Sequence, residues 1–471
     1  MQNEFAGTRE AYPEIFRDET AQQTSQDFIG SLCEEFQRNN QINPSYYKKW
    51  DVKRGLRNAD GTGVMAGVTQ VGNVRGYYMQ DGERIPMDGQ LIYRGIRVTD
   101  LIHGFVSENR FGFEETAYLL LFGALPTNDQ LEQFKQILSN YHTLPPSFTE
   151  DMIIKAPSRD VMNKLARSVL ALYSYDPIPD DNSLPAELDQ SLRLIARCPT
   201  IVAHAFAVKK HYFDNDSLYL HRPQPGLSVA ENFLYSLRRD NRFTEDEARL
   251  LDLCLVLHME HGGGNNSAFA CRVLSSAGTD IYSAIAAAVG SLKGHRHGGA
   301  NKKVREMFLC IKENVSDWKN DDQIRAILTK LIRKEAGDRS GLIYGMGHAI
   351  YTLSDPRAVL LKTFARNVAE QKGMLDELEL LESVERLTPE VFAEVKGYSK
   401  VMCANVDLYS GLVYQMLDIP PELYTPLFAI ARMVGWCAHR VEEVYYSDNR
   451  IIRPAYKAVA PSRTFVPLNQ R

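Results

Sequence analysis

Five of the eleven histidines in the chain stand in three short segments that are rich in glycine. The segments read HMEHGGGNNSAF, KGHRHGGANKK and YGMGHAIY, and they contain His258, His261, His295, His297 and His348. Imidazole can donate, accept or transfer a proton near neutral pH, and glycine lets backbone and ligand approach closely. The pattern therefore favours histidines that face a ligand over histidines that fill a core.

His297 stands between two predicted helices. The first runs from Asp280 to about Leu292 and is ended by Gly294, and the second has the apolar spacing i, i+3, i+4, i+7 in Val304, Met307, Phe308 and Ile311. The positive end of a helix dipole disfavours imidazolium, so we expect a neutral ring at position 297. A neutral imidazole can donate a hydrogen bond to a carbonyl oxygen that becomes an enolate. The alternative is a helix-capping or loop histidine.

His348 and Arg357 lie nine residues apart in the segment GLIYGMGHAIYTLSDPR. A glycine-flanked backbone can lie flat against a large ligand while His348 points at the reacting centre. Asp355 is typical of an N-cap and Pro356 of the first helical residue, which puts Arg357 in a first turn, where the dipole disfavours a cation. An anionic substrate would compensate, because a guanidinium matches a carboxylate. The alternatives are an ordinary loop histidine and a solvated surface arginine.

Arg432 and Asp407 are charged residues set among apolar ones, in PLFAIARMVGWCAH and VMCANVDLYSGLVY. A buried guanidinium needs a carboxylate from the protein or from a ligand. Desolvation would raise the pKa of Asp407 and make its carboxylate a better base. A structural ion pair at Arg432, and plain helix N-terminal chemistry at Asp407 beside Asn405, are the alternatives. Arg453, before Pro454, is a weaker candidate of the same kind.

Other chemistries lack their usual motifs. The sequence holds no H-E-x-x-H, no paired cysteines, no G-x-x-x-x-G-K-[ST] and no strand-linked G-x-G-x-x-G, so we expect neither a metal site nor a nucleotide cofactor. A zinc hydrolase built on the clustered histidines remains an alternative that chelation would test. The seven cysteines are scattered and include no C-x-x-C pair, which favours reduced thiols that fill the core.

Composition narrows the class of protein. A hydrophobic content of 44% supplies a large core, and a net charge of -5 with dispersed basic residues argues against nucleic acid as a partner. No apolar run approaches the roughly 18 residues of a membrane span, and the acidic N-terminal residues lack the basic and apolar regions of a leader. We therefore expect a cytoplasmic protein without a membrane segment.

Helical signals dominate the chain. Thr244 to Glu247 form a capping-box pattern, and Thr388-Pro389 and Thr425-Pro426 each place a capping residue before a proline suited to the first helical position. Strand-like sequence is confined to about residues 63–102. The expected class is all-α, with a small β-ribbon near the N-terminus.

Taken together, these segments resemble the citrate synthase family. The resemblance is carried by GQLIYRGIRVTDLI, FGFEETAYLLLFGALPTNDQLEQF, the stretch from NNSAFACRVLSS to KGHRHGGAN, GMGHAIYTLSDPR, NVDLYSGLVY and FAIARMVGWCAH, in this order. It implies a catalytic set of His297, His348 and Asp407. Asp407 would deprotonate the methyl group of acetyl-CoA, His297 would hydrogen-bond the thioester oxygen, and His348 would polarise the ketone of oxaloacetate. Hydrolysis of citryl-CoA would then give citrate and CoA.

The resemblance also implies ligand contacts and architecture. The oxaloacetate carboxylates would be held by His261, Arg357, Arg432 and, from the other subunit of a homodimer, Arg453. CoA would lie along Gly345, Met346 and Gly347, with Lys400 near a phosphate. The chain would form a large domain, residues 1–297 and 413–471, and a small mobile domain, residues 298–412, that closes over oxaloacetate. The CoA thioester is a substrate, and no cofactor is implied.

Departures from the family pattern leave alternatives open. Many relatives have Asp-His-Glu where this chain has Glu260-His261-Gly262, a common Gly-Pro-Leu-His is replaced at 294–297, and some relatives carry arginine where Thr352 stands. A 2-methylcitrate synthase using propionyl-CoA would need the same residues, since one methylene changes discrimination by only about 1–3 kcal/mol. A citryl-CoA lyase and a non-catalytic helical binding or regulatory protein are further alternatives.

Overall fold

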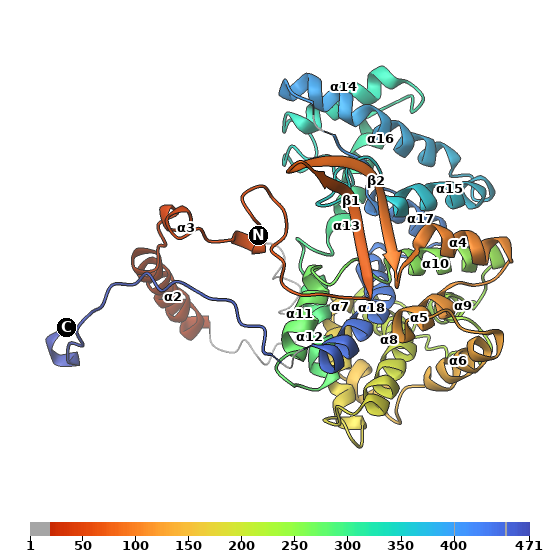
Figure 1. Ribbon diagram of the computed structural model, residues 1–471, viewed down its shortest axis with the longest axis horizontal. Coiled ribbons are helices and arrows are strands. Elements are labelled where there is room, and N and C mark those ends of the chain that lie inside the picture. Colours follow the sequence, from red (N-terminus) through yellow and green to blue (C-terminus); the bar gives the residue numbers. More distant parts are fainter. Residues whose placement is uncertain (1–18, 400, 448–449) are drawn as a thin grey trace. The chain divides into compact units, whose positions relative to one another are not determined.

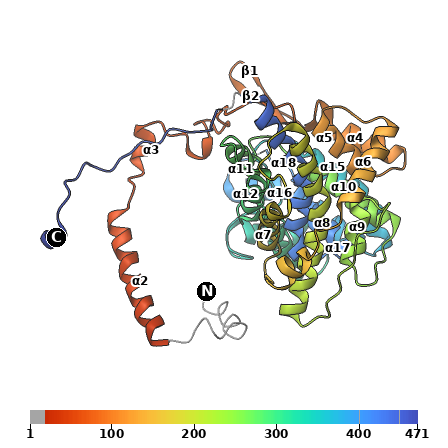
Figure 2. The ribbon, with the colours of Figure 1, turned by 90° about the horizontal axis from the view of Figure 1, so that it is seen from below.

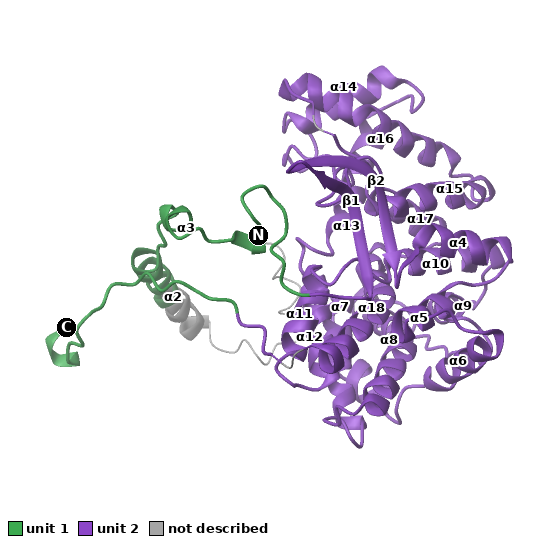
Figure 3. Cartoon of the chain, viewed as in Figure 1, with its two compact units in different colours: residues 1–67, 454–471 green, residues 68–453 purple. Residues whose placement is uncertain are grey.

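The computed structural model describes residues 19–399, 401–447 and 450–471 (Figure 1). The chain divides into two compact units, one formed by Met1–Gly67 with Pro454–Arg471 and the other by Val68–Arg453 (Figure 3). The predicted division at residues 297 and 412 follows different boundaries. These units do not test it, and it stays a prediction.

The smaller unit combines the two ends of the chain. It contains the helices α2 (Glu19–Asn39) and α3 (Ser45–Lys49) and the short 3-10 turns Arg54–Leu56 and Leu468–Gln470. The indole of Trp50 is flanked by the ammonium groups of Lys49 and Lys457, at 5.3 and 4.4 Å from the ring centre. Its helix α2 exposes the apolar side chains of Phe28, Ile29, Leu32 and Phe36.

The sheet of the larger unit is a hairpin with one short added strand. Strands β1 (Gly72–Gln80) and β2 (Glu83–Tyr93) pair antiparallel, with a register shift between Arg75 and Tyr77, and β3 (Ile96–Arg97) pairs with the end of β2. In Figure 1 the hairpin runs from the region of α18 toward α15 and α16. The ribbon predicted within residues 63–102 is confirmed.

Helices make up the rest of the larger unit, as the all-α prediction requires. They are α4 (Val98–Ser107), α5 (Phe113–Phe122), α6 (Asn128–Tyr141), α7 (Val161–Leu172), α8 (Leu184–Asp214), α9 (Val229–Leu237), α10 (Glu245–His258), α11 (Asn266–Ser275), α12 (Ile281–Lys293), α13 (Ala300–Asn314), α14 (Asp321–Ile332), α15 (Pro356–Gln371), α16 (Leu375–Lys396), α17 (Val406–Met416) and α18 (Tyr424–Tyr446). Helices α8 and α18 pack against each other at the centre of the bundle (Figure 2).

Three predicted helix starts are confirmed and two predicted caps are wrong. Thr244 caps α10 in a full capping box, Asp280 caps α12, and Asp355 caps α15 with Pro356 as its first residue. Thr425 is not the N-cap of α18, because the helix begins at Tyr424 and the hydroxyl of Thr425 donates to the carbonyl of Gly298. The prediction at Thr388-Pro389 is wrong, because α16 continues through both residues. The hydroxyl of Thr388 donates to the carbonyl of Val384, and the buried apolar stripe of α16 continues to Val391 beyond the proline. Packing of that stripe outweighs the backbone hydrogen bond that Pro389 cannot make.

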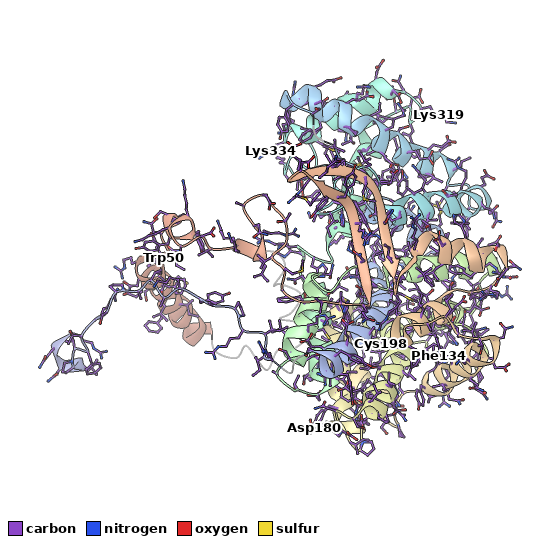
Figure 4. The ribbon with its side chains drawn as sticks, viewed as in Figure 1. Trp50, Phe134, Asp180, Cys198, Lys319 and Lys334 are labelled. Atoms are coloured by element: carbon purple, nitrogen blue, oxygen red, sulfur yellow. The ribbon has the colours of Figure 1, made fainter. Side chains whose placement is uncertain are left out.

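The core surrounds α8, which is 31 residues long. It is the one helix of the described residues that is long and apolar enough to cross a membrane, and 83% of its apolar window is buried inside the protein, as in a core helix. Figure 4 labels Cys198 on this helix, and its side chain is fully buried. All seven cysteines are free, and five of them are buried, which agrees with the predicted core-filling role.

Candidate active site

The predicted site residues come from helix ends that meet in the larger unit. His261 follows α10, His297 follows α12, His348 precedes α15, and Asp407 and Arg432 lie on α17 and α18. Helices α10, α15 and α17 lie side by side (Figure 1). The fold therefore brings together segments that are up to 171 positions apart in the sequence, from residue 261 to residue 432.

His348 is held in one orientation by the backbone that follows it. Its Nδ1 accepts hydrogen bonds from the N–H groups of Ile350 and Tyr351, each at 3.1 Å. The ring of Tyr351 stacks on the imidazole at 4.6 Å between ring centres. Burial, with the charge of Arg357 adding to it, lowers the pKa of His348 to about 4. The ring is therefore neutral at pH 7, with its proton on Nε2 and available for donation.

His261 faces the same space. Its ring centre lies 5.1 Å from that of His348 and 5.6 Å from that of Tyr351. Burial, followed by the charge of Arg357, holds the pKa of His261 well below its ordinary value. Its Nε2 is buried and has no hydrogen-bond partner among the residues that the structure describes. A buried polar nitrogen of this kind is costly unless a ligand supplies the partner.

Arg432 is a fully buried cation without an ion-pair partner. Its Nε donates to the carbonyl of His258 at 2.6 Å, and its guanidinium lies over the ring of Phe428 at 4.6 Å. Both Nη1 and Nη2 are buried and have no partner in the described part of the chain. Burial lowers the pKa of Arg432 to about 10, against the opposing effect of Glu260. An unpaired buried charge costs several kcal/mol, so this guanidinium calls for an anion.

Glu260 is the nearest candidate counter-ion, but its hydrogen bonds go elsewhere. Its Oε1 accepts from Nε2 of His439 at 3.0 Å and from the backbone N–H of Gly262. Nδ1 of His439 in turn accepts from Nη2 of Arg272 at 2.7 Å, which fixes the proton of that imidazole on Nε2. Glu260 therefore offsets the charge of Arg432 through space and leaves its two Nη groups unpartnered.

Arg357 has an anion inside the protein, which corrects the argument made from the sequence. Asp355, the N-cap of α15, accepts from Nε of Arg357 at 3.0 Å and from Nη2 at 2.7 Å. Although burial acts to lower it, this carboxylate raises the pKa of Arg357. The cation in the first turn therefore does not require a substrate anion for compensation. Nη1 of Arg357 makes no hydrogen bond to the described residues, so this side of the guanidinium is available to a ligand.

Asp407 lies in the first turn of α17, capped by the side chain of Asn405. Burial raises the pKa of Asp407 to about 6, with Arg357 opposing this shift and Asp355 adding to it. With His297 it lines a cavity of about 20 Å³. The other lining residues are His258, Gly298, Asn301, Tyr414, Tyr424, Thr425 and Phe428. A volume of this size holds about one water molecule or methyl group.

His297 is neutral for a different main reason than the one expected. Burial is the first cause that lowers its pKa to about 4, and the charge of Arg432 adds to it. Helix α13 begins only at Ala300, so the helix dipole is not needed to explain the shift. Nε2 of His297 lies 3.1 Å from the hydroxyl of Ser267, which also accepts from Nε1 of Trp436 at 3.1 Å. The hydroxyl of Ser267 has two acceptors within reach, Nε2 of His297 and Oδ1 of Asn265 at 3.0 Å. In the tautomer in which the hydroxyl donates to Nε2, the proton of His297 is on Nδ1.

Comparison with known proteins assigns the arrangement to a family. A family model described as "Citrate synthase, C-terminal domain" matches residues 60–455. The chain belongs to the citrate synthase family. Citrate synthase from Synechocystis sp. is 34% identical over 393 residues, which cover 82% of this chain and 89% of that protein. Citrate synthase from Deinococcus radiodurans is 36% identical over 345 residues, covering 73% and 84%.

Solved structures agree with this assignment. The crystal structure of citrate synthase from Thermotoga maritima is 30% identical and superposes with a TM-score of 0.68, covering 89% of this chain and 99% of that one. A ternary complex of citrate synthase from Thermoplasma acidophilum with carboxymethyl coenzyme A and oxaloacetate is 26% identical, with a TM-score of 0.71 and the same coverage of 89% and 99%. As a citrate synthase, the chain is an acyltransferase that forms citrate.

The glycine-rich approach to His348 has a structural role in this citrate synthase. Gly345 accepts from the N–H of Asn405 at 2.8 Å, and Gly347 donates to the carbonyl of Cys403 at 2.7 Å. A Cβ on Gly345 would lie 2.9 Å from the Cα of Leu408. Glycine is therefore needed there for close packing, and the pairing ties the segment of His348 to that of Asp407. Whether CoA lies along Gly345, Met346 and Gly347 stays a prediction.

One predicted contact, Arg453, is not brought into this cluster, and another, Lys400, has no described position. Arg453 is exposed, and its charge contributes to none of the pKa shifts described above. Its predicted position in the site of a second subunit stays a prediction. Lys400 lies outside the described residues. The described residues also contain no group of three or more His, Cys, Asp and Glu side chains that could hold a metal ion.

Four residues of the site were missed from the sequence. They are Tyr351, Ser267, Asn301 and Glu260, which respectively stack on His348, contact His297, line the cavity, and offset the charge of Arg432. Three of them lie within four positions of a residue that was singled out: Tyr351 is three positions after His348, Asn301 four after His297, and Glu260 adjacent to His261. Polar and aromatic residues close to a candidate were the available signal for these three, whereas Ser267 lies six positions after His261 and had no such signal.

Proposed function

We propose that this citrate synthase binds oxaloacetate against Arg432 and His261 and condenses it with an acetyl-CoA enolate formed by Asp407. The observation that carries the proposal is a set of three buried nitrogens that have no hydrogen-bond partner within residues 19–399, 401–447 and 450–471: Nη1 and Nη2 of Arg432 and Nε2 of His261. Evolved interiors rarely leave such donors unpaired, and a dicarboxylate supplies their acceptors. The family's substrates, acetyl-CoA and oxaloacetate, include one such dicarboxylate.

In this proposal each carboxylate of oxaloacetate meets a separate cation. The fork of Arg432 takes one carboxylate through two parallel hydrogen bonds, and Nη1 of Arg357 takes the other. His261, as a neutral donor, completes the contacts. Nε2 of His348 then donates to the ketone oxygen, which polarises the carbonyl carbon toward attack.

The acyl half of the reaction takes place at Asp407 and His297. With a pKa of about 6, Asp407 is mostly ionised at pH 7, yet it binds a proton more strongly than an exposed aspartate does. It removes a proton from the acetyl methyl group while Nδ1 of His297 donates to the thioester oxygen. The enolate carbon forms a bond to the ketone carbon of oxaloacetate, and His348 gives its Nε2 proton to the alkoxide. The proton that Asp407 took from the methyl group then returns to Nε2 of His348, which closes the proton balance of the condensation. Water then cleaves the thioester of citryl-CoA to citrate and CoA.

The small cavity beside Asp407 supports acetyl-CoA over propionyl-CoA. Its volume of about 20 Å³ accommodates a methyl group, and a further methylene would have to displace buried side chains such as Asn301 and Tyr414. One methylene changes discrimination by about 1–3 kcal/mol. We therefore place 2-methylcitrate formation second to citrate formation.

The finer assembly is part of the same proposal. Two chains form a homodimer in which Arg453 reaches the oxaloacetate of the partner subunit, and residues 298–412 move as a small domain that closes over the substrate. Closure fits the chemistry, because a water-excluding site protects the activated thioester until the carbon-carbon bond has formed. CoA binds beside Gly345 and Gly347, and the reaction requires no cofactor beyond this thioester substrate.

A thiol-release assay tests the proposal. The purified protein is mixed with oxaloacetate and either acetyl-CoA or propionyl-CoA, in the presence and absence of a chelator. We expect thiol release that requires both substrates, survives chelation and is faster with acetyl-CoA. Thiol release without oxaloacetate would identify a plain thioesterase, and loss of activity with chelator would favour the metal alternative.

A further inference from the structure

The β1–β2 hairpin lies directly against the segment that separates His348 from Arg357. The hydroxyl of Thr352 donates to the carbonyl of Gly76 on β1 at 2.5 Å and lies 3.4 Å from the carbonyl of Met87 on β2. The hydroxyl of Ser354 accepts from the N–H of Gly89 at 3.1 Å and donates to Asp88 at 2.9 Å. Residues 88 and 354 also form an isolated parallel bridge.

Two glycines allow this backbone-to-backbone contact. A Cβ on Gly76 would lie 2.4 Å from the carbonyl oxygen of Ile350, and a Cβ on Gly89 would lie 2.1 Å from that of Ser354. Gly76 falls at the register shift of the hairpin, between Arg75 and Tyr77. Any side chain at either position would push the segment away, so the contact is built into both strands.

The same hairpin also contacts the segment that carries His261. A Cβ on Gly72 would lie 2.6 Å from Cγ of Glu260, and the hydroxyl of Tyr93 lies 3.0 Å from the carbonyl of Val256 and 3.3 Å from that of Glu260. The open end of the hairpin therefore touches the residue before His261, and its middle touches the residues after His348. It bridges the two imidazoles whose rings are 5.1 Å apart.

We propose that the hairpin positions His348 for its reaction with oxaloacetate, and that the hydroxyls of Thr352 and Ser354 are the contacts through which it does so. This inference rests on the proposed function. The chain of contacts is short, because Nδ1 of His348 accepts from the N–H groups of Ile350 and Tyr351, the residues just before Thr352. Thr352 is a positioning residue in this scheme, since it acts on the ketone only through His348.

Loss of this support has a specific kinetic consequence. A displacement of a catalytic group by about 1 Å costs on the order of 100-fold in rate. In the proposed function Arg432 holds one carboxylate and Arg357, which is fixed by Asp355, holds the other. Neither contact uses the hydroxyl of Thr352, so the first binding of oxaloacetate is preserved. The proposal therefore predicts a loss in kcat that exceeds the change in the dissociation constant of oxaloacetate.

The test uses the full-length variants Thr352→Val, which keeps the side-chain shape and removes the hydroxyl, and Ser354→Ala. We expect each to lower kcat by about 10-fold and the double variant by up to about 100-fold, with the melting temperature and the oxaloacetate dissociation constant nearly unchanged. Thr352→Ser should restore most of the activity. Thr363→Val is the matched control, because that hydroxyl bonds only to the carbonyl of Val359 within α15.

A second measurement reports on His348 without any turnover. The measurement is nuclear magnetic resonance of protein whose histidine side chains carry a nitrogen isotope label. The imidazole nitrogen resonances of His348 should shift in Thr352→Val and stay unchanged in Thr363→Val, while those of His297 should stay unchanged in both variants. A wild-type protein that releases no thiol with oxaloacetate would refute the proposed function alone. Unchanged His348 resonances in Thr352→Val, or an active wild type whose double variant retains its kcat within twofold, would overturn the role of the hairpin.

Discussion

Helix α18 carries two fully buried arginines, and their surroundings differ. Arg440, near the C-terminal end, donates from Nε and Nη2 to the carboxylate of Glu187 at 3.2 and 2.6 Å, and Nη2 also reaches Asn182 at 3.1 Å. Arg432, eight residues earlier, makes one hydrogen bond to the described residues, from Nε to the carbonyl of His258. Both side chains are 0% exposed. Burial therefore does not distinguish these two arginines, whereas the ion pair with Glu187 does.

The same contrast applies to the carboxylates. Glu187 is committed to Arg440, while Asp407 faces a cavity and has no ion-pair partner among the described residues. The ion pair of Arg440 and Glu187 is complete within the protein, whereas we propose that Arg432 and Asp407 act on the substrates. Four variants or conditions test this comparison.

Asp407→Asn should have the largest effect, because it removes the proposed base. Turnover should fall by about 100- to 10,000-fold, while oxaloacetate binding measured by calorimetry is largely kept. Asp376→Asn, an exposed aspartate in the first turn of α16, serves as the control and should remain active. An Asp407 variant that lost its dicarboxylate instead would show that this residue binds oxaloacetate.

Arg440→Leu should break the structural member of the pair. It leaves the carboxylate of Glu187 buried without a cation, which costs about 3–5 kcal/mol of unfolding free energy. Denaturant unfolding should show this loss, while kcat and the oxaloacetate dissociation constant at 25 °C remain those of the wild type. A variant with full stability and impaired substrate binding would reverse the assignment of the two arginines.

Arg432→Leu should have the opposite signature. Oxaloacetate affinity should fall by about 2–5 kcal/mol, because one carboxylate loses its cation. The unfolding free energy should stay the same or rise, since an unpaired buried charge is removed and Glu260 keeps its hydrogen bond from His439. Calorimetric titration and denaturant unfolding of the same preparation measure both quantities. Strong destabilisation with unchanged affinity would make Arg432 a structural residue.

The pH dependence should be the mildest test. Asp407 accepts a proton only when ionised, and its pKa is raised to about 6, so kcat/KM for acetyl-CoA should fall tenfold per pH unit below about 6 and level off above it. His297 and His348, with pKa values lowered to about 4, stay neutral over this range and add no second inflection. A kcat/KM that shows no inflection near pH 6 would mean that Asp407 is exposed in the working enzyme or is not the base.

Short sequence patterns predicted the start of a helix correctly where a single capping residue determines it. The capping box at Thr244 and the N-cap at Asp355 were both read correctly from short-range sequence. Thr388-Pro389 was misread because the decisive interaction is the packing of α16 against α14, which no local signal records. Sequence reasoning therefore predicted helix starts better than it predicted where a helix continues.

In the site, the sequence identified the residues and the structure supplied their partners. Asp355 was recognised as a cap, but its second role, pairing with Arg357, depends on the side chain folding back over its own helix start. The need of Arg432 for an anion was foreseen. That Glu260 would be engaged by His439, 179 residues away, could not be, because this contact exists only after α18 has packed against the end of α10.

The unpaired guanidinium of Arg432 also has a consequence for the stability of the folded protein, if oxaloacetate is its ligand. A ligand that binds only the folded state adds RT ln(1 + [L]/Kd) to the unfolding free energy, about 2.7 kcal/mol at a hundred times Kd. In the proposed function oxaloacetate pairs with this buried charge, so its supply would add to the resistance of the enzyme to heat. Scarcity of the keto acid would then limit the amount of intact enzyme as well as its rate.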